Sequence, residues 1–219
     1  MSLNKIYLFR MLHVNNISHV LTNGITHKNS PNRNPNFVPI GEGSIIDKRT
    51  NHLAIIDNGG QLGFGYIETI TLGDLIPFYF GPRSPMLYKI EKGGDGVNKV
   101  HPKDIVYIVT NVEQIVNSGI KYYFTDGHAI PAYTKFYNSD RVNDISTLVD
   151  IEAAWAKYWK SDTDLDLKRR KEAEFLVQND IPPQYILGYV CYNEETKEKL
   201  VSFGIPENRI EVKSNYYFT

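Results

Sequence analysis

Short apolar runs separated by polar turns recur along the chain, and each run predicts a strand. The runs are rich in Ile, Val, Leu, Tyr and Phe. The strands predicted in this way cover residues 6–12, 75–80, 105–109, 122–125, 188–192, 210–212 and 216–218, with a return strand beginning at Ile25. Residues 175–177 are also apolar, and they predict a buried strand or the last turn of a helix.

Helical spacing of apolar residues predicts helices between these strands. They cover residues 17–23, 112–118, 151–159 and 194–203. Asn15–Asn16 is expected to cap the first helix and Gly24 to end it, while Asn111 and Gly119 bound the second. Because helices and strands mix without a regular βαβ rhythm, we expect an α+β fold in one domain over residues 1–219.

Three connecting stretches differ from ordinary short turns. Residues 27–39 contain three prolines and several asparagines without periodicity, which predicts a long loop that is functional or mobile. Residues 40–49 predict a tight turn followed by one short helix. Residues 61–71 alternate Gly with apolar residues at their start and predict an extra hairpin.

Composition sets limits on the class of protein. The 219 residues are 42% hydrophobic with a net charge of −1, so the chain can bury a sizeable core and has no overall attraction to nucleic acid. Cys191 is the single cysteine, which excludes an internal disulfide and suits a reducing compartment. There is no signal-peptide pattern and no apolar run of membrane-spanning length, so we expect a cytoplasmic protein without a membrane partner. Tyrosine is unusually frequent, with 15 residues.

Several familiar chemistries have no support in the sequence. There is no GxGxxG or GxxxxGK[ST] phosphate loop, and no GxSxG nucleophile turn. Residues 162–166 begin like a calcium loop, but the required Gly and Glu do not follow, so a solvated acidic turn is favoured. The six histidines lack zinc-ligand spacing, and no metal is expected.

Glu174 lies between a basic run, residues 168–171, and the apolar residues 175–177. A carboxylate at the start of a rigid element can be held against a substrate cation or hydroxyl. A surface ion pair explains the same residues, and from this stretch alone it is the more common arrangement.

Basic residues occur together with aromatic residues or methionine at two places and form a run at a third. Arg83 precedes Met86 and Tyr88, a second group covers residues 157–160, and the third is the basic run 168–171. Each group alone is typical of a solvated face. Together they suit a groove for single-stranded nucleic acid, where cations hold phosphates and aromatic rings meet bases.

The order of several blocks resembles one family. Residues 77–88, PFYFGPRSPMLY, resemble the PFYFxPxSPML signature of the DarT toxins, which are DNA ADP-ribosyltransferases. Residues 124–128 resemble their FTDxH block, and residues 173–177 resemble the block around their catalytic glutamate. Residues 12–17, 40–49 and 216–218 match the remaining pattern, so the resemblance covers nearly the whole chain.

The resemblance implies an ADP-ribosyltransferase fold with two packed antiparallel sheets, flanking helices and NAD between them. It implies transfer of ADP-ribose from NAD to a base in single-stranded DNA, thymidine in the best-known branch and guanosine in another. It also implies a partner antitoxin, DarG, whose macrodomain removes the modification. A catalytically idle single-stranded nucleic-acid binder on the same fold remains an alternative from a different class.

Individual residues take roles from the same resemblance. Glu174 and Arg49 match the catalytic pair. The residues that match cofactor contacts are Arg10, Met11, Leu12, His13, His19 and His27, together with Arg49. The residues that match DNA contacts are Arg83, Ser84, Met86, Tyr88, His128, Lys157, Tyr158, Trp159, Lys168, Arg169 and Arg170.

Two departures from the family pattern are visible. A histidine that often precedes the block at Pro77 is missing, and residues 61–71 are inserted. Some members also have His where this chain has Arg10. None of these changes removes Glu174 or Arg49, but the insertion is expected to affect the choice of substrate.

The chemistry is consistent with these roles. Breaking the N-glycosidic bond of NAD builds positive charge on the ribose carbon, and a carboxylate such as Glu174 stabilises that charge. Arginine is a poor base because its pKa is very high. Arg49 is therefore expected to act first as an electrostatic and positioning group.

Overall fold

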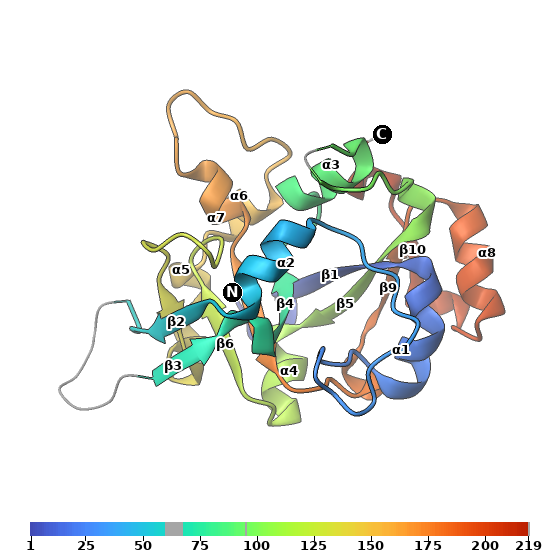
Figure 1. Ribbon diagram of the computed structural model, residues 1–219, viewed down its shortest axis with the longest axis horizontal. Helices are drawn as coiled ribbons and strands as arrows, with labels where there is room; N and C mark the ends of the chain where they lie inside the picture. Colours follow the sequence, from blue (N-terminus) through green and yellow to red (C-terminus); the bar gives the residue numbers. More distant parts are fainter. Residues whose placement is uncertain (60–67, 95, 219) are drawn as a thin grey trace.

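The computed structural model describes residues 1–59, 68–94 and 96–218, and the strands within them form an eight-stranded and a two-stranded sheet (Figure 1). The strands are β1 (Tyr7–His13), β2 (Leu53–Ile56), β3 (Glu68–Thr71), β4 (Leu75–Tyr79), β5 (Ile105–Asn111), β6 (Tyr122–Thr125), β7 (Phe136–Tyr137), β8 (Glu174–Gln178), β9 (Gly188–Cys191) and β10 (Ile210–Val212). Among them, the large sheet has the order β10-β9-β5-β1-β4-β8-β6-β7, and β2 pairs with β3.

Two groups of four strands meet near the middle of the large sheet. Within the described residues, β1 pairs with β4 through Phe9 and Tyr79 alone. In contrast, β1 and β5 pair along the full length of both strands, and β4 pairs with β8 from Leu75 to Tyr79. This narrow junction lets the two groups turn toward each other and enclose a core.

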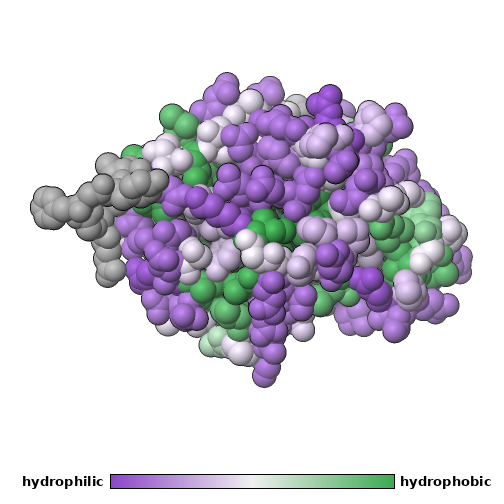
Figure 2. All heavy atoms as spheres, turned by 90° about the horizontal axis from the view of Figure 1, so that it is seen from below, coloured by the Kyte–Doolittle hydropathy of each residue, from purple (hydrophilic) through white to green (hydrophobic). Residues whose placement is uncertain are grey.

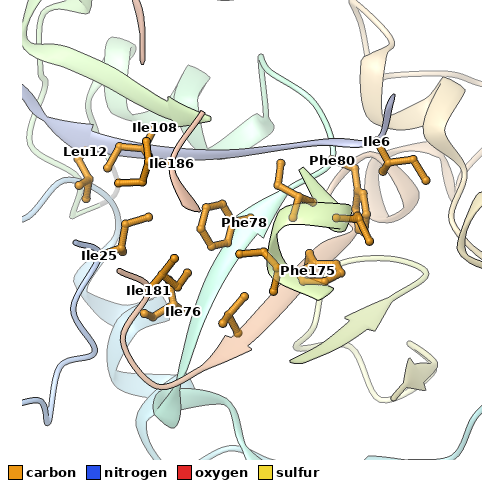
Figure 3. Packing of buried hydrophobic residues seen from close by; sticks show 14 of the residues in the cluster. Ile6, Leu12, Ile25, Ile76, Phe78, Phe80, Ile108, Phe175, Ile181 and Ile186 are labelled. Atoms are coloured by element: carbon orange, nitrogen blue, oxygen red, sulfur yellow. The ribbon is translucent and has the colours of Figure 1, made fainter. Parts of the chain in front are cut away.

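The core lies between the two groups of strands (Figure 3). Ile108 of β5 and Leu12 of β1 contribute from one group, while Phe78 of β4 and Phe175 of β8 contribute from the other. All four side chains are buried. The expected α+β class is therefore confirmed. Where two packed antiparallel sheets were expected, the described strands form one mixed eight-stranded sheet, in which β9 and β10 pair in parallel, and one two-stranded sheet.

Short helices connect and cover the strands. The α-helices are α1 (Ile17–Asn23), α2 (Gly43–Thr50), α3 (Pro85–Lys92), α4 (Val112–Ser118), α5 (Ile145–Leu148), α6 (Ile151–Trp155), α7 (Leu167–Lys171) and α8 (Glu194–Ser202) among the described residues. None of them is long and apolar enough to cross a membrane. On the face shown in Figure 2, hydrophilic residues cover most of the surface and hydrophobic residues form smaller patches between them.

Most predicted elements are present, and α4 illustrates why. The Asn111 side chain accepts a hydrogen bond from the Gln114 amide at 2.8 Å, and Gly119 ends the helix with φ 70°. Both signals are local, because a cap depends on residues three or four positions away. The loop at residues 27–39 is also confirmed, as is the helix predicted within residues 40–49.

Four local expectations are wrong. Asn16 does not cap α1, because its side-chain amide bonds the backbone of Val38 instead. Ile25 makes an isolated bridge with Ile181 and does not begin a strand. The helix expected over residues 151–159 ends at Trp155, and residues 214–216 form a 3-10 turn in place of the closing strand.

Two further differences concern the connections. Helix α3 begins at Pro85, in a stretch where no helix was predicted, and Ser84 caps it. Of the stretch 61–71, where an extra hairpin was expected, the structure describes the residues of β3, which pair in antiparallel fashion with β2; a hairpin within 61–71 stays a prediction. Residues 61–67 lie outside the described part of the chain.

Candidate active site

Glu174 is held rigidly at the first position of β8. Its side chain is almost completely buried, and its backbone N–H donates to Thr125 Oγ1 at 2.9 Å. The Ala129 amide donates to Glu174 Oε1 at 3.0 Å. Because residues 175–177 are buried in the same strand, the carboxylate has a fixed direction.

Arg49 reaches this carboxylate from the last turn of α2. Its Nη1 lies 3.0 Å from Oε1 and 2.8 Å from Oε2 of Glu174, a contact between residues 125 positions apart. Arg49 Nη2 is buried and has no hydrogen-bond partner within the described residues. The two residues expected to form the catalytic pair are thus brought together, with one guanidinium donor left over.

Arg10 adds a second buried positive charge close to Arg49. Its Nη1 donates to the Pro77 carbonyl at 2.9 Å, and burial followed by the nearby Arg49 charge lowers the pKa of Arg10 to about 10. Arg10 Nε and His27 Nε2 are also buried and lack partners in the part of the chain that the structure describes. Buried unpaired polar groups are costly, so three such atoms at expected cofactor positions fit an absent polar or anionic ligand.

The loop at residues 27–39 is fastened at both ends. Asp180 accepts hydrogen bonds from the His27 amide and the Ser30 hydroxyl, both at 2.6 Å. Asn16 joins the other end through Val38, with contacts of 2.8 and 2.9 Å. His19 Nε2 lies 2.9 Å from the Asn32 carbonyl oxygen, so this expected cofactor residue contacts the loop as well.

Three other expected cofactor residues have different surroundings. Leu12 is a core residue that is 4% exposed. Met11 packs against the hydrophobic cluster of α3 and β5, and His13 accepts a hydrogen bond from the Asn15 amide at 3.2 Å. Their contact with a cofactor stays a prediction, and the observed roles are structural.

His128 lies in the electrostatic neighbourhood of the Glu174–Arg49 pair. Its pKa is lowered, chiefly by burial, with Arg49 and Lys168 acting in the same direction and Glu174 opposing them. Its backbone N–H donates to the Arg169 carbonyl at 2.9 Å. Burial thus favours the neutral form of the His128 imidazole, and contact of this side chain with a substrate base stays a prediction.

Sequence reasoning missed two groups beside Glu174. Tyr79 is the cross-strand partner of Glu174, and burial, followed by the charges of Glu174 and Glu172, raises the pKa of its hydroxyl. Burial also raises the pKa of Glu172 to about 7. Tyr79 could have been found only by pairing the strand predicted at residues 75–80 with the apolar residues 175–177. For Glu172, the signal was its position two residues before Glu174.

The arginines of the basic run are occupied by aspartates. Arg169 contacts Asp166 at 2.7 and 2.8 Å and Asp126 at 2.8 Å. Arg170 pairs with Asp150 and Asp164. Two aspartates of the acidic stretch at residues 162–166, Asp164 and Asp166, thus pair with the arginines of the run. Phosphate contacts by these two arginines stay a prediction, and each would have to leave its carboxylates first.

A glycine permits part of this arrangement. A Cβ on Gly127 would lie 2.2 Å from Arg169 Nη1, closer than nonbonded atoms approach. The backbone at residue 127 can therefore lie this close to Arg169 because glycine has no side chain.

The two lysines of the run differ completely. Lys168 is exposed and has no ion pair within the described residues. Lys171 is 2% exposed, and its Nζ donates to the Ala154 and Ala156 carbonyls at 3.0 and 2.6 Å. Burial lowers the pKa of Lys171 to about 8. These two contacts satisfy carbonyls at and just after the end of α6, which otherwise have no partner in the helix.

The other expected DNA residues divide into buried and exposed sets. Ser84 is 2% exposed, and its hydroxyl accepts from the Leu87 amide at 3.2 Å, so it is turned away from the surface. Met86 is partly buried against the α3 cluster. Tyr88, Lys157 and Tyr158 are exposed, and Trp159 is half-buried beside Tyr88.

A cavity of about 490 Å³ lies beside the basic run and not at Glu174. Its lining includes Asp126, Asp150 and Arg170, which are already members of the ion-pair network. The described residues contain no cluster of three or more His, Cys, Asp or Glu side chains able to hold a metal ion. The unpaired donors near Glu174 are the better-supported ligand site.

Known structures have the same fold. The chain superposes on the structure titled "Thermus sp. 2.9 DarT in complex with ADP-ribosylated ssDNA" with a TM-score of 0.80, at 24% identity, over 97% of this chain and 96% of that one. The fold is therefore that of a DarT ADP-ribosyltransferase.

Sequence comparisons give the family. The family described as "ssDNA thymidine ADP-ribosyltransferase, DarT" matches residues 9–218. A DNA ADP-ribosyl transferase of Escherichia coli O127:H6 is 31% identical over 98% of this chain and 94% of its own length. A DNA ADP-ribosyl transferase–DNA ADP-ribosyl glycohydrolase fusion protein of Thermosipho africanus is 25% identical over 88% of this chain and 44% of its own. The chain belongs to the DarT family.

Proposed function

We propose that this enzyme transfers ADP-ribose from NAD to thymidine in single-stranded DNA. The observation that carries the proposal is the buried Glu174 carboxylate, fixed by Arg49 and by the Ala129 amide at the start of a rigid strand. Because the family match covers residues 9–218, it supports our proposal that residues 1–219 form a single ADP-ribosyltransferase domain.

Residues that carry unpaired donors would hold NAD. Arg10 and Arg49 suit its pyrophosphate, and His27, at the start of the loop over residues 27–39, can donate a further hydrogen bond. NAD supplies the ADP-ribosyl group and loses nicotinamide. Glu174 would accept a hydrogen bond from a ribose hydroxyl and stabilise positive charge on the ribose carbon as the bond breaks.

The acceptor base would approach from the side of His128. Arg49 is an electrostatic and positioning group in this proposal, because one of its donors already bonds Glu174 and the other is free to meet substrate. Proton acceptance by Arg49 would require its prior deprotonation, which is unfavourable for a guanidinium group.

The biological setting follows from the family. As a member of the DarT family, the chain would act as a toxin by modifying DNA, and a DarG-like macrodomain antitoxin is the expected partner. The glycohydrolase named in the Thermosipho africanus fusion protein supports this pairing. We place the reaction in the cytoplasm, where DNA and NAD are both present.

The test is a mass measurement on short oligonucleotides. The protein is incubated with NAD and four oligonucleotides, each rich in one base, and a gain of one ADP-ribose is expected on the thymidine-rich strand. Glu174→Gln serves as the inactive control. A gain on the guanosine-rich strand would identify the other branch. Binding without any gain would identify a catalytically idle binder and overturn the proposal.

A further inference from the structure

Asp180 connects the catalytic strand to the loop over residues 27–39. It lies two residues beyond the end of β8, after Asn179, whose φ of 74° turns the chain. Asp180 Oδ1 accepts the His27 backbone N–H and Oδ2 accepts the Ser30 hydroxyl, each at 2.6 Å. The two oxygens of one carboxylate therefore hold the start of the loop at two points.

The backbone beside these contacts is paired as well. Ile25 and Ile181 exchange two backbone hydrogen bonds of 2.9 Å, and Figure 3 shows their buried side chains next to each other. Ser30 is buried, and its hydroxyl also accepts a hydrogen bond from the Asn32 amide at 2.9 Å. Because breaking buried hydrogen bonds leaves costly unpaired groups, the first residues of the loop have a fixed position relative to β8.

The same segment of chain returns to the other end of β8. Helix α2 follows the loop, and its Arg49 bonds Glu174, the first residue of the strand. Asp180 is six residues beyond Glu174, which is at most about 20 Å of extended chain. The two ends of the segment 27–49 therefore lie at the two ends of the catalytic strand.

Buried nitrogen atoms without a partner occur along the whole of this length. Arg49, with its unpaired Nη2, lies at the first residue of β8. Arg10, with its unpaired Nε, bonds the carbonyl of Pro77, which pairs with Leu176 in the middle of the strand. His27, whose Nε2 has no partner among the described residues, lies beyond the end of the strand. An elongated ligand beside β8 would meet all three.

The Asn29 amide decides which His27 nitrogen carries the proton. It donates to His27 Nδ1 at 3.2 Å, and a ring nitrogen that accepts a hydrogen bond has no hydrogen of its own. The proton of the imidazole is therefore on Nε2, which makes the unpaired nitrogen a donor. Asp180 holds the backbone on both sides of this contact, at His27 and at Ser30.

We propose that Asp180 is a positioning residue for NAD: it holds His27 so that Nε2 donates to the cofactor. Asp180 thereby sets the affinity for NAD and not the rate of the chemical step. This inference rests on the proposed function, which makes NAD the ligand beside the catalytic pair. It gives a role to a carboxylate that lies outside every block on which the family resemblance rests.

Two substitutions of Asp180 test this role. Asp180→Ala removes both acceptors, and calorimetric titration should show a Kd for NAD about tenfold higher, the size of one lost hydrogen bond to the ligand. Asp180→Asn keeps an oxygen for the His27 amide and has an NH₂ group that can donate to the Ser30 hydroxyl. Its Kd should stay within about threefold of the wild-type value.

Transfer kinetics separate binding from chemistry. With saturating NAD and a thymidine-rich oligonucleotide, kcat of both variants should stay within about twofold of wild type, because the contacts of Glu174 are unchanged. The KM for NAD should follow the Kd, and the KM for the oligonucleotide should not change.

A double-mutant cycle shows whether Asp180 acts through His27. His27→Ala alone should raise the Kd for NAD about tenfold, and adding Asp180→Ala should raise it no further. An aspartate that only stabilises the fold would weaken NAD binding by the same factor with or without the imidazole. Rescue in Asp180→Asn and non-additivity with His27→Ala are both needed for the positioning role.

Controls separate these results from general damage. Asp144 is 54% exposed and pairs with Arg141, and Asp144→Ala should leave the Kd for NAD at the wild-type value. Urea unfolding checks that each variant is folded. If Asp180→Ala does not fold, Ser30→Ala takes its place, because it removes one of the two contacts and should raise the Kd about threefold.

The outcomes distinguish the two proposals. If the wild type binds NAD but transfers no ADP-ribose, the proposed function fails, while the comparison of Asp180→Ala with Asp180→Asn still decides the role of Asp180. An unchanged Kd in Asp180→Ala, or additive effects of His27→Ala and Asp180→Ala, overturns the positioning role and leaves the proposed function standing.

Discussion

Arg10 and Arg49 at the catalytic end, and Arg169 and Arg170 in the basic run, are two pairs of arginines with opposite surroundings. In the first pair, each guanidinium keeps a buried nitrogen without a partner among the described residues. In the second pair, four aspartates surround the guanidinium groups, and ion pairing raises the pKa of both arginines.

The difference separates charge that is available to a ligand from charge that maintains the fold. A guanidinium that already meets two carboxylates gains little from a phosphate, because one ion pair would replace another. A buried donor without a partner gains a full hydrogen bond when a ligand arrives. Local sequence makes the basic run the more obvious anion site, whereas the contacts favour Arg10 and Arg49.

The largest effect should come from the catalytic carboxylate. We expect Glu174→Gln to lower the rate of ADP-ribose transfer by ~10³-fold or more while the Kd for NAD changes little, because the charge is needed mainly in the transition state. Single-turnover kinetics and calorimetric NAD titration measure the two quantities. Glu198→Gln on the exposed face of α8 is the control, and a transfer rate near wild type in Glu174→Gln would show that another group stabilises the transition state.

The second prediction concerns Glu172, which lies in the sequence between the basic run and Glu174. Burial raises its pKa from 4.5 to about 7, with Lys168 and Lys171 opposing the shift and Glu174 adding to it. Between these pH values the folded chain binds more protons at this site than the unfolded chain, so its contribution to stability falls as the pH rises.

Glu172→Gln should remove this dependence. The wild type is expected to lose on the order of 3 kcal/mol more than the variant between pH 4.5 and 7. Urea unfolding at several pH values measures the difference, with Glu198→Gln as the exposed control. Parallel stability curves for wild type and Glu172→Gln would contradict the assignment.

A third prediction addresses the occupied arginines. Arg169→Ala should lower the free energy of unfolding by about 2 kcal/mol, because it leaves Asp126 and Asp166 without their partly buried partner. Urea unfolding measures this loss. The rate of ADP-ribose transfer per folded molecule should fall much less than in Glu174→Gln. A loss of DNA affinity without any loss of stability would show that Arg169 serves DNA binding and not the fold.

The smallest effect is expected at the exposed lysine of the same helix. Lys168→Ala should leave stability within about 0.5 kcal/mol, because surface substitutions seldom do more. Its slope of log affinity for single-stranded DNA against log salt should fall by about 0.7, the value for one lost phosphate contact. An unchanged slope would mean that Lys168 is simply a solvated side chain.

Local sequence determined much of the fold and the centre of the site. Apolar periodicity predicted β4, β5, β6 and β9, and the caps Asn111 and Gly119 predicted α4, because each signal lies within a few residues. Glu174 and Arg49 were found through the blocks that resemble the DarT family, and the fold places them in direct contact.

Tertiary structure decided how the remaining polar side chains are used. The sequence shows Asn16, Arg83 and Lys171 as a cap, a phosphate ligand and part of a basic run, yet each bonds backbone far along the chain. Their partners lie 22, 134 and 17 residues away, respectively. A side chain's local neighbours reveal its charge and its helical or strand preference, but folding selects its partner, because burial makes any unpaired polar group costly.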